Sequence, residues 1–176
     1  MRIHLGGSSR QSLVAARAQL DAAVKGASSA SASELSAHLF FAAEVFATNT
    51  SLRRAFTDAS RDASSKSALV KDLFGSKISS SAADLLAAVA GLRWSAAGDL
   101  VIVIEQLAIE AEASAANIDG ALDRLESEFF EVSRLIADNF ELRKALVGNG
   151  SVDAKGALIA DVLSKSASAS TVKLAV

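Results

Sequence analysis

The chain of 176 residues has 18 basic and 20 acidic side chains spread evenly along it, which excludes the basic surface that nucleic-acid-binding proteins present to phosphates. Cysteine is absent, which excludes disulfides, thiol catalysis and thiolate metal sites. Hydrophobic residues make up 51% of the chain. Proline is absent, although average usage would give about nine. Because proline breaks helices, we expect a mostly helical protein with short polar turns.

The apolar residues of the first half recur at helical spacings of three and four, between Ser, Asp and Gly residues that can cap helix ends. This pattern predicts five helical segments, followed by a sixth that begins near Ala96. The five segments are 10–25, 32–47, 52–56, a short helix between the caps at 62–65 and Gly75, and 81–93.

Residues 100–109 are rich enough in β-branched side chains to suggest a strand. We favour a buried helix, because an Ala- and Glu-rich run follows and no other segment offers a strand partner. The longest unbroken apolar run, 100–104, stops at Glu105, so no membrane-spanning helix is expected.

The second half carries the clearest helical stripe of the chain. Its apolar members are Leu122, Leu125, Phe129, Val132, Ile136 and Phe140. A turn at 148–150 precedes a helix at 154–163, which Ser151 or Asp153 would cap. A last helix opens near Thr171 and is still apolar at Val176, so we interpret the chain as a fragment of a longer polypeptide.

A repeat links the two halves. Residues 47–56 recur as 137–146 with five of ten positions identical, and residues 66–74 recur as 155–163. What recurs is a pattern of apolar positions with a few polar landmarks, which indicates a duplicated folding unit. We expect a linker at 1–9, a first helical module at 10–98 and a truncated second module at 99–176, with the helix at 97–114 shared by both modules.

No constellation in the chain predicts catalysis, a cofactor or a metal. His4 and His38 are isolated, which favours surface or capping roles over metal ligation. The Gly-containing runs 6–9 and 148–151 lack the Lys of a phosphate loop, and no Ser lies in a nucleophile elbow. We therefore expect a protein that is not an enzyme.

Two basic pairs occupy matching places in the repeat: Arg53 with Arg54, and Arg143 with Lys144. They can supply the positive charge that stabilises a helix C-terminus, or they can contact an acidic partner. We favour the first interpretation, and the second stays open.

The order of these landmarks resembles the delta subunit of bacterial F-type ATP synthase, the family of the mitochondrial oligomycin-sensitivity-conferring protein. The family's N-terminal module reads as an acidic amphipathic helix, an Asn-x-x-Leu-Arg turn, and a Ser-x-x-x-Lys cap before a Leu-rich helix. The run 122–163 carries this order, and the first copy has the same landmarks at Asn49, Leu52, Arg53, Lys66, Leu69, Leu73, Gly75, Lys77, Leu85, Leu86 and Arg93.

The presence of two copies resembles the actinobacterial form, in which delta is fused behind the b subunit and carries a second module. Two prolines of the family pattern are replaced here, one of them by Thr50 or Phe140. The family's C-terminal region, which contacts the b subunit, has no counterpart before residue 176.

The resemblance implies an all-α fold, with a six-helix delta-type module followed by the truncated copy. It further implies a groove between the helices 10–25 and 81–93 that accepts the N-terminal helix of the alpha subunit of the catalytic head. The partner-binding residues would be Leu13, Ala16, Leu20, Leu86, Val89 and Leu92. The same stripes would serve equally as the core of a bundle, and this alternative stays open.

The implied function is that of a non-enzymatic stator, which links the catalytic head to the b subunit of the peripheral stalk. The implied place is peripheral, at the cytoplasmic face of the plasma membrane, without direct membrane insertion. The alternative is a helical-bundle ligand-binding protein or enzyme with an apolar pocket around 100–109.

Overall fold

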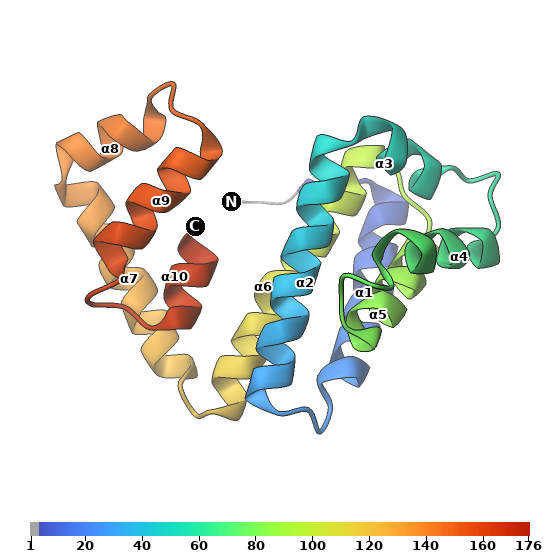
Figure 1. The fold of residues 1–176 in the computed structure, drawn as a ribbon, viewed down its shortest axis with the longest axis horizontal. Coiled ribbons are helices and arrows are strands. Elements are labelled where there is room, and N and C mark those ends of the chain that lie inside the picture. The colour runs from blue at the N-terminus through green and yellow to red at the C-terminus, as the bar shows by residue number, and fades with distance from the viewer. Residues whose placement is uncertain (1–3) are drawn as a thin grey trace. The chain divides into compact units, whose positions relative to one another are not determined.

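Across residues 4–176, which the computed structural model describes, the chain forms ten helices and no strand (Figure 1). The predicted all-α class is confirmed. Residues 100–109 lie inside α6 (Ala97–Ile118), so the helical interpretation of that segment is also confirmed. The chain divides into two compact units, the first ending at Ala115 and the second beginning at Ala116.

Unit 1 is built around α5, which packs against three other helices. Its six helices are α1 (Gly7–Val24), α2 (Ser29–Thr48), α3 (Thr50–Thr57), α4 (Ala63–Phe74), α5 (Ser80–Ala90) and α6. The ring of Phe46 lies 5.0 Å from that of Phe56 and 5.6 Å from that of Phe74, which joins α2, α3 and α4 in one aromatic cluster. These contacts and the buried face of α6 give unit 1 a continuous core.

The first two helices begin earlier than predicted. α1 starts at Gly7, so residues 7–9 of the predicted linker are helical, while residues 1–3 lie outside the described part of the chain. α2 starts at Ser29 rather than 32, because the side chain of Ser28 accepts a hydrogen bond from the backbone N–H of Ser31 and so caps the helix.

Unit 2 contains four helices around a smaller core. They are α7 (Leu122–Asp138), α8 (Phe140–Val147), α9 (Val152–Leu163) and α10 (Ala169–Ala175). α7 packs against α8 and α10, and α9 packs against α10. The buried core residues are Val132, Leu142, Ile159 and Leu163.

The stripe predicted for 122–140 is buried only in part. Leu125 and Val132 are buried, whereas Leu122 and Phe140 are 41% and 63% exposed. The stripe fails at its end because α7 stops at Asp138 and Asn139 begins a new helix, so Phe140 no longer follows the periodicity of α7.

Candidate functional site: the groove between α1 and α5

α1 and α5 lie against each other in unit 1, and both helices are rich in alanine. Small side chains allow two helices to approach closely while leaving shallow channels between them. Polar contacts from α1 reach the segment that follows α5 and the first turn of α6. The hydroxyl of Ser12 donates to the carbonyl oxygen of Arg93, just beyond α5, and Ser9 donates to Asp99 with an O–O distance of 2.6 Å.

The six residues predicted to contact a partner fall into two groups. Ala16, Leu20, Leu86 and Val89 are at most 2% exposed and belong to the core of unit 1. Leu13 and Leu92 are half-buried and pack against the same core. Of the six residues, only Leu13 and Leu92 therefore keep enough exposed surface for a partner to touch.

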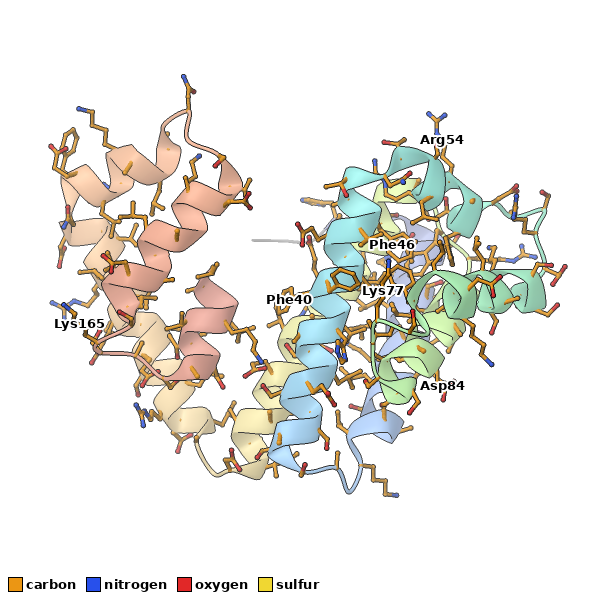
Figure 2. The ribbon with its side chains drawn as sticks, in the orientation of Figure 1. Phe40, Phe46, Arg54, Lys77, Asp84 and Lys165 are labelled. Carbon is orange, nitrogen blue, oxygen red and sulfur yellow. The ribbon has the colours of Figure 1, made fainter. Side chains whose placement is uncertain are left out.

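A hollow of about 430 Å³ opens between the C-terminal half of α1 and the N-terminal half of α5. Its lining residues are Gln19, Ala22, Ala23, Ser80, Ser81, Asp84 and Leu85. Asp84 is the one charged member of this lining. It is exposed on α5 and has no hydrogen-bond or ion-pair partner among the described residues (Figure 2). The hollow opens between the two helices that the resemblance selects, but none of the six residues predicted from the stripes lines it.

A hydrogen bond from α2 holds the N-terminus of α5 beside this hollow. The backbone N–H of Ser79 donates to the Nδ1 atom of His38 over 3.2 Å, and the Ser79 side chain caps α5 by accepting from Ala82 N–H. His38 is half-buried and has a helix-capping contact, whereas His4 is exposed.

Arg53 and Arg143 perform the same task in the two units. The guanidinium of Arg53 donates to the carbonyl oxygens of Phe46 and Ala47 at the end of α2, and Arg143 donates to Ile136 and Ala137 at the end of α7. In each unit an Asn between the two helices caps the second one. The geometry therefore supports the helix-terminus interpretation for these arginines.

The second members of the two basic pairs lie differently. Arg54 and Lys144 are exposed, and Arg54 points out from α3 (Figure 2). Neither one takes part in the contact that its neighbour makes with the helix end.

Glu128 is a buried carboxylate with a structural role that the sequence analysis did not predict. It is only 8% exposed and accepts hydrogen bonds from the Ser168 backbone N–H, the Ser168 hydroxyl, the Thr171 hydroxyl and the Arg124 guanidinium. Burial alone would raise the pKa of Glu128, but these donors outweigh it and lower that pKa to about 2. The carboxylate thus holds the N-terminus of α10 against α7.

The described residues contain no group of three or more His, Asp or Glu side chains that could hold a metal ion. Within the same range, no helix is both long enough and apolar enough to cross a bilayer. What the geometry offers is an open hollow lined by small apolar side chains and by polar ones, which suits binding of another polypeptide.

Several curated relatives of this chain carry the name ATP synthase subunit delta. The chain is 38% identical over 169 residues to the ATP synthase subunit delta of Streptomyces coelicolor, an alignment covering 96% of this chain and 61% of that protein. It is 35% identical over 170 residues to the subunit of the same name from Kineococcus radiotolerans, covering 96% and 61%. The match to the Rhodococcus opacus subunit is 35% over 162 residues, covering 90% and 57%.

The chain therefore spans about three fifths of the length of these relatives. No protein-family model matches it. The relatives nevertheless confirm the family resemblance drawn from the sequence.

Proposed function

We propose that this homologue of the ATP synthase delta subunit is a non-enzymatic stator component that connects the catalytic head to the peripheral stalk of an F-type ATP synthase. Two findings support the proposal: the similarity to delta subunits along nearly the whole chain, and the open groove between α1 and α5. An adaptor of this kind needs docking surfaces rather than reacting groups, and its place is peripheral, at the cytoplasmic face of the membrane.

The occupant of the groove is the N-terminal helix of the alpha subunit. The observation that carries this assignment is the hollow of about 430 Å³ between the two helices that the family resemblance selects. Ala22, Ala23 and Leu85 supply an apolar bed, and Ser80, Ser81 and Gln19 supply a polar rim, which together match the two faces of an amphipathic helix.

The second proposed element is a duplicated module. The turn contacts of Arg53 and Arg143 are alike, and each is preceded by a capping Asn. Likewise, His38 on α2 accepts from the N-terminus of α5, as Glu128 on α7 does from the N-terminus of α10. These shared contacts support descent of α7–α10 and α2–α5 from one ancestral module, as in a delta subunit fused to the b subunit.

The function is tested by calorimetric titration of the chain with a synthetic peptide of the alpha-subunit N-terminal helix from the same organism. Ala22→Trp and Ser81→Trp place a bulky ring in the groove from opposite walls, and we expect each to weaken binding at least tenfold. Ala68→Trp is the matched control, because Ala68 is an exposed alanine on α4 outside the lining. Folded groove variants that bind like the parent would remove this groove as the site.

The alternative of a ligand-binding or catalytic bundle depended on a pocket around 100–109. Leu100, Ile104 and Leu107 in that segment are at most 1% exposed and fill the core of unit 1. The hollow between α1 and α5 is not lined by any residue of that segment. No observation therefore favours the alternative.

A further inference from the structure

Unit 2 contains a pocket of its own, with a volume of about 200 Å³. α7 forms one side, and the end of α9 with the connection to α10 forms the other. The lining residues are Glu128, Glu131, Val132, Leu135, Leu163, Ser166 and Ala167. The stator proposal for the α1–α5 groove makes no use of this pocket.

The positions of unit 1 that the proposed repeat matches to this pocket carry larger apolar side chains. When the proposed repeat is used to match the units, Glu131 and Leu163 correspond to Phe41 and Phe74, whose rings meet edge to face at 6.3 Å. Ala167 corresponds to Ile78, which is buried. At the matched positions, unit 1 thus carries two phenylalanines and an isoleucine where the lining of the pocket has Glu131, Leu163 and Ala167.

The size of the space indicates what could occupy it. An apolar cavity of about 150 Å³ is large enough to hold benzene. The pocket in unit 2 exceeds that volume, and Val132, Leu135 and Leu163 give it an apolar wall. An aromatic side chain that enters from a partner would replace the ring that Phe41 supplies in unit 1.

The negative charge at the mouth of the pocket further limits which partner groups could bind there. Glu128 is already engaged by four hydrogen bonds, whereas Glu131 is exposed and has no hydrogen-bond or ion-pair partner among the described residues. A carboxylate at the mouth of an apolar pocket favours a cation beside the entering ring.

The same charge disfavours a second copy of this chain as the occupant. The most exposed phenylalanines of unit 2 are Phe130 and Phe140, which are 66% and 63% exposed. They stand beside Glu131 and Glu141 in the sequence. Inserting either ring into the pocket of another copy would bring carboxylates together.

We propose that this pocket, between α7 and the α9–α10 connection, is a second docking site that takes an aromatic side chain flanked by Lys or Arg from a partner protein. The ring would lie against Val132, Leu135 and Leu163, and the basic group would pair with Glu131. The site depends on the stator proposal only through the alignment of the two units. Its test is independent of binding at the α1–α5 groove.

The test uses the whole chain and phenethylamine, which joins an aromatic ring to a cation, with 2-phenylethanol as its neutral counterpart. In methyl NMR spectra we expect phenethylamine to shift the signals of Leu135 and Leu163 and to bind several-fold more tightly than 2-phenylethanol. Glu131→Gln should abolish that difference. Leu163→Phe, which restores the residue found at position 74, should weaken binding at least tenfold, and Ala167→Ile provides a second filling variant.

Three results would overturn the proposal. The first is that phenethylamine binds equally well to the parent and to the Leu163→Phe and Ala167→Ile variants, when unchanged circular dichroism shows that both variants are folded. The second is equal affinity for the charged and neutral probes in the parent chain. The third is self-association of the parent, measured by sedimentation, that a filling variant abolishes, since the occupant would then be a second copy.

Discussion

At the scale of single residues, a few polar side chains form hydrogen bonds with backbone groups at helix ends, which apolar packing alone would leave without partners. The last carbonyl groups of a helix lack partners within the helix, and Arg53 and Arg143 reach back to supply donors. Both residues belong to basic pairs visible in the sequence. Their partners lie six and seven residues away, so a helix-terminus role was predictable from local sequence.

Replacement of Arg53 tests this role. We expect Arg53→Ala to lower the free energy of unfolding by about 2 kcal/mol, because two hydrogen bonds to a charged donor are lost at the end of α2. Arg54→Ala, at the exposed neighbour, should change it by less than about 0.5 kcal/mol. Urea unfolding of both variants measures the difference, and equal losses would contradict the assignment.

Glu128 should make the stability of unit 2 depend on pH. Hydrogen bonds from Ser168 and Thr171 outweigh burial and hold the pKa of Glu128 at about 2, below the ordinary value of 4.5. The ionised carboxylate therefore stabilises the folded state above about pH 4.5, and this contribution is lost as the pH falls toward 2. The difference in unfolding free energy between the parent and Glu128→Gln should shrink between pH 6 and pH 3.

A constant difference for Glu128→Gln would show that its hydrogen bonds do not contribute. The role of Glu128 could not be predicted from local sequence, because its hydrogen-bond partners at the start of α10 lie 40 and 43 residues away.

At the scale of helices, periodicity predicted which segments are helical but not which stripe faces outward. Leu86 and Val89 on α5 follow the expected spacing, yet both are buried in the core. The lining of the groove includes polar and small residues such as Ser81 and Ala22, which carry no hydrophobic signal. A shallow groove between Ala-rich helices is therefore hard to distinguish from core by sequence pattern alone.

Val89→Asp shows the consequence for mutational tests. Val89 is fully buried, so we expect an unpaired carboxylate there to unfold unit 1 at 25 °C, as seen in the loss of helical circular dichroism. Val14→Asp on α1 should leave unfolding nearly unchanged, because Val14 is 69% exposed. A Val89→Asp variant with the unfolding midpoint of the parent would contradict the burial of α5 described here.

At the scale of the whole chain, the two units differ in the size of their cores. Unit 1 buries three phenylalanines together with one face of α6, whereas the buried core of unit 2 consists of four aliphatic residues. The all-α class and the family resemblance were accessible from the sequence, because periodicity and landmark order are local features. The division of the chain after Ala115 could not be read from the sequence, since α6 runs across it without interruption.

This difference predicts unequal stability. In native-state hydrogen exchange, the slowest amides of α9 should open at a lower free energy than those of α5, because less apolar area is buried around α9. The measurement is made on the intact chain, so that both units experience the same conditions. Equal opening energies would mean that the two units unfold as one cooperative body.

The stator account is tested most directly by mapping the alpha-subunit N-terminal helix onto the chain. Titration of the labelled chain with this peptide should shift the backbone amide signals of Gln19, Ala22, Ala23, Ser81 and Asp84, which lie on the facing sides of α1 and α5. The amides of α8 should not move. Absence of any shift, or shifts confined to helices other than α1 and α5, would contradict the central claim.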